Sequence, residues 1–166
     1  MNTSPLDRRT PIDDRMFNPF LGVLLVSSFS NAYHSQRLVG APMPLLFVNS
    51  GVVLHGPSRS AVNSHLSSYG LYRLTQTHPE MLVNADQRVR ALQGFTRASV
   101  LLALQLGVVE MDNEFRVRCV SKPKFTATGL KPLVEASTKM GTHCSRLNPA
   151  EVFIALKVGV IPCLHV

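Results

Sequence analysis

Few side chains in this sequence have the types and spacing that catalysis requires. General acid–base catalysis needs groups that are buried and lie close together. The chain carries ten Asp and Glu residues, and those that could pair fall where solvent or the positive end of a helix dipole accounts for them. These carboxylates are Asp13 and Asp14 in the first segment, Asp112 and Glu114 at a predicted hairpin tip, and Glu80, Asp86 and Glu151 in predicted helices. We therefore expect no catalytic residues and no enzyme activity.

Metal or thiol chemistry would have to come from the six histidines and three cysteines. His143 adjoins Cys144, and a second pair, Cys163 and His165, lies near the end of the sequence. Structural zinc sites usually take their ligands in pairs such as CxxC, and an odd cysteine count without that spacing also argues against a disulfide framework. A metal-dependent or thiol enzyme is the third hypothesis, which bound zinc or a reactive cysteine would establish. The chain also has no GxxxxGK loop that could bind a nucleotide. From the cysteine and histidine spacing and the missing loop together, we expect no cofactor, no metal and no small-molecule substrate.

Basic residues are the more informative group. The net charge is +7 although charged residues make up only 16% of the chain, which favours contact with nucleic acid, an anionic membrane surface or an acidic protein face. Some basic side chains fall on or after a predicted hairpin, where they could meet the phosphates of double-stranded DNA or an acidic partner. The alternative is that they are solvated and keep the hairpin edge from pairing. The candidate contact residues are Arg88, Arg90, Arg97, Arg116, Arg118, Lys122 and Lys124.

The N-terminal region is a second candidate binding element. Residues 1–16 combine opposed charges with few large apolar side chains, so we expect a flexible leader. Asn18-Pro19 then predicts the start of a helix that runs to Arg37 or Leu38, because Asn is a good N-cap and Pro is tolerated at the first helical position. This helix is either an ordinary core helix or, with the leader, a segment that folds onto a partner. The candidate partner-binding residues are Phe17, Asn18, Pro19, Phe20 and Leu24.

Gly and Pro divide the next part of the chain into short helices. Residues 42–55 are apolar, and we expect a buried helix that is broken near Gly51. Ser58 is a candidate N-cap for a helix that ends at His65. Residues 71–77 are expected to form a further short helix.

Two longer helices are expected to follow. Pro79 predicts the start of an amphipathic helix that reaches Leu92. Gly94 is expected to separate it from a helix over 95–106. This second helix is apolar nearly all round, so we expect it to lie at the centre of the fold.

A hairpin and two closing helices complete the prediction. Gly107 is a good residue to end a helix, and the alternation over 108–120 predicts a hairpin. The closing helices are expected over 128–139 and 149–158, the second capped by Asn148. Helix, helix and hairpin in that order are typical of a winged-helix unit. The expected fold is therefore mainly α with a short β-hairpin, in a winged-helix-like helical domain.

The domain organisation follows from these elements. We expect a flexible leader over 1–16 and a single helical, winged-helix-like domain over 17–166. No apolar run approaches the ~20 residues that a membrane-spanning helix needs, and the N-terminus lacks the features of a signal peptide. We therefore expect a cytoplasmic protein that makes no contact with a membrane.

Four stretches of the chain share their order and spacing with a known bacterial family. They are Phe17-Asn18-Pro19-Phe20, Pro44-Leu45-Leu46-Phe47 through Val53-Leu54-His55-Gly56-Pro57-Ser58-Arg59, Phe95-Thr96-Arg97-Ala98 with Leu106-Gly107, and 149–162. On these motifs the chain resembles the middle component of bacterial three-component ABC ATPase conflict systems, the group that includes Lamassu-type antiphage defence. Asn49-Ser50-Gly51 departs from the continuous apolar run expected there.

The resemblance implies a role inside a complex. In such systems an SMC- or Rad50-like ABC ATPase senses foreign DNA, and a separate effector, often a nuclease, does the damage. The middle component would be a small accessory subunit, an adaptor between the two without catalytic residues of its own. The alternative hypothesis is a free-standing winged-helix DNA-binding regulator. That alternative explains the basic hairpin but makes no use of the leader.

Overall fold

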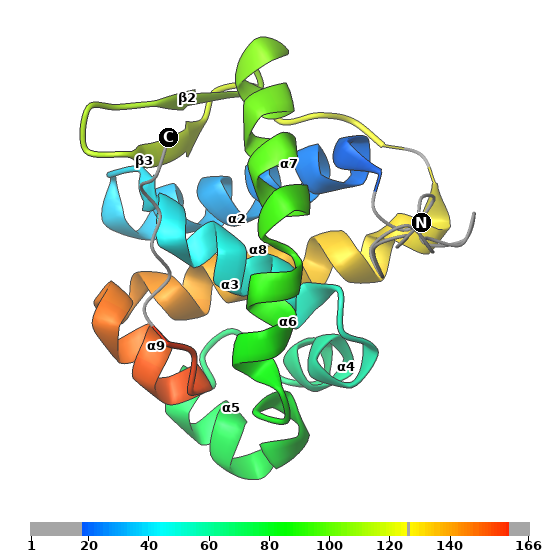
Figure 1. Cartoon of the computed structure of the whole chain (residues 1–166), viewed down its shortest axis with the longest axis vertical. Helices are drawn as coiled ribbons and strands as arrows, with labels where there is room; N and C mark the ends of the chain where they lie inside the picture. The colour runs from blue at the N-terminus through cyan, green and yellow to red at the C-terminus, as the bar shows by residue number, and fades with distance from the viewer. Residues whose placement is uncertain (1–17, 126, 160–166) are drawn as a thin grey trace, which may run out of the picture.

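The structure is a computed structural model that describes residues 18–125 and 127–159. Most of these residues are helical, and one small antiparallel sheet lies near one end of the molecule (Figure 1). The expected fold class, mainly α with a short β-hairpin, is confirmed. In chain order the elements are α2 (Pro19–Arg37), β1 (Ala41–Pro42), α3 (Met43–Val53), α4 (Gly56–Ser64), α5 (Leu71–Thr77), η2 (Pro79–Met81), α6 (Ala85–Ala91), α7 (Gln93–Gln105), β2 (Val109–Met111), β3 (Arg116–Cys119), η3 (Thr128–Leu130), α8 (Lys131–Ser145) and α9 (Pro149–Leu156).

Helix α2 begins and ends where the sequence predicts. The Oδ1 atom of Asn18 accepts a hydrogen bond from the backbone N–H of Phe20 at 2.9 Å, which satisfies one of the unpaired donors of the first turn. The helix ends at Arg37, and Leu38 follows in the left-handed conformation with φ 60°. The predicted cap and the predicted length are both confirmed.

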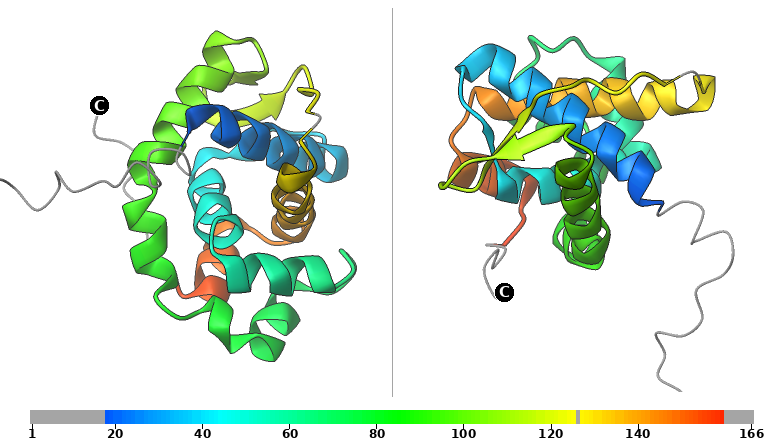
Figure 2. Two further views of the ribbon diagram at one scale, coloured as in Figure 1. Left: turned by 90° about the vertical axis from the view of Figure 1, so that its right-hand side faces the viewer. Right: turned by 90° about the horizontal axis from the view of Figure 1, so that it is seen from above.

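Small residues let α2 pack closely against α7 and α8 (Figure 2). A Cβ atom on Gly22 would lie 1.7 Å from Ser99 Oγ on α7. A Cβ atom on Gly141 of α8 would lie 2.4 Å from the carbonyl oxygen of Phe29. The two glycines therefore set how near the three helices can come.

Helix α3 is the buried helix that the apolar stretch predicts. Residues 45–53 are all buried. The helix continues through Gly51 without interruption, so the predicted break there is wrong. The glycine serves packing instead, because a Cβ atom at this position would lie 2.5 Å from Val89 Cγ2 on α6.

Helix α4 starts earlier than predicted and has a different cap. His55 is the N-cap, and its Nδ1 atom accepts from the backbone N–H of Ser58 at 3.4 Å and lies 2.7 Å from Ser58 Oγ. The predicted cap at Ser58 is therefore wrong, although Ser58 takes part in the capping contact. Helix α5 has the predicted bounds.

The predicted single helix from Pro79 to Leu92 is wrong, because the chain forms η2 and then α6. Between them Asn84 adopts a left-handed conformation with φ 53°. The Arg88 guanidinium group holds this turn by donating to the carbonyl oxygen of Met81 at 2.8 Å. A carbonyl oxygen that accepts a hydrogen bond from a side chain does not need one from the next turn of a helix. The helix can therefore end here.

Helix α7 lies on the surface, so the prediction of a central helix is wrong (Figures 1 and 2). The residues of α7 that face α2 must have small side chains, because α2 comes close at Gly22. Leu101 consequently points outward and is mostly exposed. The predicted separator, Gly94, lies inside α7, and the two helices are divided at Leu92. The buried residues of α7 are Thr96, Ser99, Val100 and Ala103.

The predicted hairpin is confirmed and belongs to a three-stranded sheet. Gly107, with φ 64°, follows α7 as expected. Strands β2 and β3 then pair antiparallel, and β1 adds to β3 to give the order β1-β3-β2. Strand β1 is not expected from the sequence. Its Pro42 is tolerated because β1 is an edge strand, where a missing N–H leaves no ladder bond unmade.

The two closing helices are confirmed, but their bounds differ from the predicted ones, because α8 begins at Lys131, after η3, and α9 ends at Leu156. Helix α8 continues past the predicted end at Lys139 to Ser145. Helix α9 has the predicted cap, because Asn148 Oδ1 accepts from the N–H of Glu151 at 2.9 Å. The carboxylate of Glu151 in turn accepts from the N–H of Asn148 at 2.8 Å, which completes a capping box.

Two statements about organisation stay predictions. The leader over 1–16 and Phe17 lie outside the described residues, as does part of the predicted domain over 17–166. The winged-helix likeness also stays a prediction, and the chain inserts α4, α5, η2 and α6 between α3 and α7. Within the described ranges, no helix is both long and apolar enough to cross a bilayer.

Candidate partner-binding surfaces

The start of α2 presents an apolar face. Phe20 is 61% exposed, and Leu24 lies one turn further along the same face and is half-buried. The opposite side of the helix, marked by Gly22, packs against α7. Asn18 fixes the first turn, and Pro19 is half-buried at the first helical position. The structure thus brings Phe20 and Leu24 together, while Phe17 lies outside the described residues.

Arg88 has a structural role in the fold. Its Nη2 atom donates to the Met81 carbonyl at 2.8 Å and its Nε to the Gly51 carbonyl at 3.3 Å. A further hydrogen bond goes to the carbonyl of Val83. Burial lowers the pKa of this guanidinium group from its ordinary value. We therefore leave Arg88 out of the candidate contact residues.

Arg90 is part of a link between α6 and the end of α9. Its Nε atom donates to Asp86 Oδ2 at 2.7 Å, and Asp86 Oδ1 accepts from the backbone N–H of Gly159 at 2.8 Å. The hydrogen bond from Arg90 is the main cause that holds the pKa of Asp86 below its usual range. Both charged groups are substantially exposed, so the contribution of this pair to stability is small.

The hairpin carries two arginines, and each forms an ion pair with a glutamate. Arg118 Nε donates to Glu110 Oε1 at 2.9 Å, and Arg116 Nη2 lies 2.5 Å from Glu114 Oε2. At the tip, Asp112 Oδ1 accepts from the backbone N–H groups of Glu114 and Arg116, each at 2.9 Å. Asp112 therefore has a structural role, because its carboxylate fixes the conformation of the turn.

The remaining basic candidates are exposed. Arg97 lies on the outer face of α7, and Lys122 and Lys124 lie between β3 and η3 on a segment that runs past α2 (Figure 1). Within the described residues none of these three side chains has an ion pair or hydrogen bond. Arg116 and Arg118 therefore lie on the hairpin, the two lysines follow on the segment after β3, and Arg90 lies on α6.

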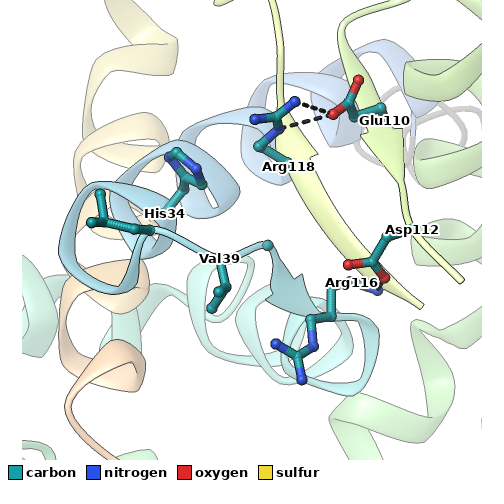
Figure 3. A pocket seen from close by; sticks show the side chains of 8 residues that line it. His34, Val39, Glu110, Asp112, Arg116 and Arg118 are labelled. Carbon is teal, nitrogen blue, oxygen red and sulfur yellow. Dashed lines mark hydrogen bonds and ion pairs between the residues drawn. The ribbon is translucent and has the colours of Figure 1, made fainter. Parts of the chain in front are cut away.

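A hollow of about 320 Å³ separates the end of α2 from the hairpin. Figure 3 shows His34, Val39 and Arg116 around it, together with the ion pair of Arg118 and Glu110. The other lining residues are Leu38, Gly40 and Asp112.

Leu38 and Val39 at this hollow are exposed, and the sequence analysis missed them as candidates. Residue type gave no signal for this position. The left-handed residue that ends a helix is usually Gly or Asn, but here it is Leu38, and the nearest glycine, Gly40, comes two residues later.

A further cluster near α5 links ionisable side chains. His78 Nδ1 lies 2.9 Å from Glu80 Oε1, and His78 Nε2 lies 2.8 Å from His65 Nε2. The His65 ring stacks on Tyr69 with centroids 4.4 Å apart, and the Arg73 guanidinium lies 4.5 Å from the centroid of the Tyr69 ring. These contacts tie the α4–α5 loop to η2.

The adjacent His143 and Cys144 are both buried in α8. Burial lowers the pKa of His143 to about 4 and raises that of the Cys144 thiol to about 12, so both are neutral near pH 7. Burial also raises the pKa of Cys119. The pair Cys163 and His165 lies outside the described residues. In the part of the chain that the structure describes, no three His, Cys, Asp or Glu side chains gather to hold a metal ion.

A family comparison decides what kind of protein carries these surfaces. A model described as ABC-three component (ABC-3C) system Middle Component 3 matches residues 6–160. The chain belongs to this family. The resemblance inferred from the four motifs is thereby confirmed at the level of an ABC-3C middle component. No curated protein and no solved structure gives a significant match to the chain.

Membership places this middle component in a system of several subunits. Such a system implies partner subunits, with an ABC ATPase among them. The relevant surfaces of an ABC-3C middle component are therefore those that can contact other macromolecules.

Proposed function

We propose that this middle component is a non-catalytic adaptor in a Lamassu-type antiphage defence complex. It would link an SMC- or Rad50-like ABC ATPase to an effector subunit, for which a nuclease is the expected type, in the cytoplasm. The observation that carries the proposal is the family match over residues 6–160, which spans nearly the whole chain.

The structural roles of the ionisable groups support the non-catalytic part of the proposal. Asp112 shapes the hairpin turn, Glu151 completes the capping box of α9, and Asp86 links α6 to Gly159. His55 caps α4. Each of these side chains has a structural reason for its position.

The first proposed contact is the start of α2. A phenylalanine that is 61% exposed stands at the first turn of a helix whose other side is tightly packed. Aromatic side chains are enriched at protein interfaces because they bury a large area at a small entropic cost. Phe20 and Leu24, with Phe17, Asn18 and Pro19 before them, would dock on the ATPase or the effector.

The second proposed contact is the basic hairpin end. Arg116, Arg118, Lys122 and Lys124 would meet double-stranded DNA within the complex or an acidic face of a partner. The two arginines form ion pairs with exposed carboxylates. Exposed pairs of this kind contribute little to the stability of the fold, so the arginines can exchange partners. Arg90 and Arg97, which lie on α6 and α7, are weaker members of this proposed set.

The alternative function is a free-standing winged-helix regulator. The observation in its favour is Arg118 on a hairpin that directly follows α7. A regulator should bind a DNA duplex alone, with log K falling by about 0.9 per phosphate contact for each unit of log salt. An adaptor should bind its partner subunits and show little duplex affinity by itself.

A matched pair of variants tests the first contact. Phe20→Ser should reduce recovery of the partner subunits when the three components are co-expressed. Ile154→Ser is the control, because Ile154 is similarly exposed, at 68%, but lies on α9. Equal recovery with Phe20→Ser and wild type would remove the start of α2 from the proposal.

A further inference from the structure

Two unfavourable features coincide at Leu38. The residue adopts a left-handed conformation with φ 60°, and its side chain is 79% exposed. Left-handed backbone is costly for residues with a bulky side chain, which is why glycine or asparagine usually ends a helix in this way. A fold that needed only to end α2 at this point would be served better by glycine, so the leucine side chain itself needs an explanation.

The surroundings of Leu38 suit contact with another protein. Its neighbour Val39 is also exposed, and both residues line the hollow of about 320 Å³ beside the hairpin (Figure 3). Apolar residues at a depression with a charged rim are the usual arrangement at the centre of a protein interface.

The charges around the hollow indicate what the partner carries. Glu110 is engaged by Arg118, and Asp112 accepts hydrogen bonds from two backbone N–H groups. Among residues 18–125 and 127–159, the guanidinium group of Arg116 has an ion pair with Glu114 alone, whose side chain is mostly exposed at the hairpin tip. The carboxylates of the hollow thus have internal partners, whereas Arg116 can exchange Glu114 for a carboxylate from outside.

We propose that Leu38 and Val39 anchor a partner subunit of the same system. An apolar side chain of that subunit packs on Leu38 and Val39 beside the hollow, and a neighbouring carboxylate pairs with Arg116. This inference rests on the proposed adaptor function and adds a contact that is separate from the start of α2.

The test replaces the side chain without harming the backbone. Leu38→Gly suits φ 60°, so the isolated chain should keep or raise its melting temperature. Recovery of the co-expressed ABC ATPase or of the third subunit should fall roughly tenfold, as expected when one anchor residue is lost. Leu38→Met keeps an apolar side chain and should retain most of the recovery.

Lys157→Gly is the matched control. Lys157 also ends a helix in the left-handed conformation, with φ 53°, at the end of α9. This variant should change the melting temperature in the same direction as Leu38→Gly and leave recovery of the partners unchanged. The pair of variants therefore separates a backbone effect from loss of the leucine side chain.

Three outcomes would overturn the inference. If Leu38→Gly recovers both partners as well as wild type does, the leucine is no anchor. If Leu38→Gly loses only duplex binding, the hollow contacts nucleic acid and the proposed protein partner is wrong. If wild type itself recovers no partner subunit, the adaptor function fails as well, which distinguishes that failure from the first.

Discussion

Glu110 and Arg118 lie directly opposite one another on β2 and β3, and Arg118 Nε donates to Glu110 Oε1 at 2.9 Å. Both side chains are about half exposed, so the pair contributes only about 0–1 kcal/mol to stability. The same exposure leaves the guanidinium group accessible to an acidic partner. This pair therefore offers a way to alter the charge of the hairpin face while the fold is kept.

The first prediction concerns that face. Reversing the charge of Arg116 and Arg118 to Glu should weaken the complex with the partner subunits or its response to DNA, because the reversed groups repel an acidic surface. Affinity for the co-purified partners, measured at two salt concentrations, is the direct readout, and the loss should be larger at low salt.

A charge exchange is the control for this prediction. Glu110→Arg combined with Arg118→Glu restores an ion pair across the strands and keeps the net charge. The exchanged chain should melt like wild type but still bind the partner less well, because the positive charge has moved. Undiminished binding by the reversed variant would show that the hairpin arginines contact nothing acidic.

The second prediction concerns pH and His143. This side chain is 1% exposed, and burial lowers its pKa to about 4 from a value of 6.5 in the unfolded chain. The unfolded chain therefore binds more protons between pH 6.5 and 4, so stability falls as the pH falls through this window. The wild-type chain should lose about 2 kcal/mol from this group on going from pH 7 to pH 5.

Comparison with His143→Leu isolates this effect. Denaturant unfolding of the two chains at pH 7 and pH 5 should give a clearly shallower pH dependence for the variant. Other acid-sensitive groups, such as Asp86 with its lowered pKa, act equally in both chains. Parallel pH dependences would mean that His143 is protonated equally in the folded and unfolded chains.

The third prediction concerns the contact of α8 with α2. Gly141→Ala would place a Cβ atom 2.4 Å from the carbonyl oxygen of Phe29, which is backbone and cannot turn away. Unfolding should become easier by about 1–3 kcal/mol, as for other overpacked interiors. Gly94→Ala in α7 meets nothing within 4 Å and should instead stabilise by about 0.5 kcal/mol. Calorimetry measures the stability of each variant. Equal changes in stability for the two variants would contradict the close packing of α8 on α2.

Local interactions are the part of the fold that the sequence predicts well. The caps at Asn18 and Asn148 and the left-handed Gly107 depend on neighbouring residues only, so residue type and spacing were sufficient to place them. The hairpin was predicted for the same reason, because its alternation and its turn are local.

Contacts between distant segments account for the errors. Gly51 resembles a helix break, but its absent Cβ makes room for Val89 on α6. Residues 95–106 are mostly apolar, which led to the prediction of a central helix, yet the close approach of α2 at Gly22 selects the small face of α7 for burial and leaves Leu101 outside. Neither relationship can be inferred from the sequence without knowing which helices meet.

The candidate surfaces divide in the same way. Residue type and position suggested Phe20 and the hairpin arginines as candidates, and they stay predictions, although Phe20 and Arg118 are exposed in the structure. Sequence reasoning included Arg88, whose role is to hold the turn at Met81, because the sequence does not show which arginine side chains bond backbone carbonyl oxygens. It missed Leu38, since a left-handed conformation at leucine contradicts the residue preference that guides prediction.

Co-purification tests the central claim most directly. The tagged chain would be expressed together with the ABC ATPase and the third subunit of its system, and the recovered material analysed by mass spectrometry and sizing. The adaptor function predicts stoichiometric recovery of the ATPase in a complex much larger than the chain. Recovery of the chain alone, as a stable monomer or dimer that binds a DNA duplex with steep salt dependence, would contradict it and favour the regulator.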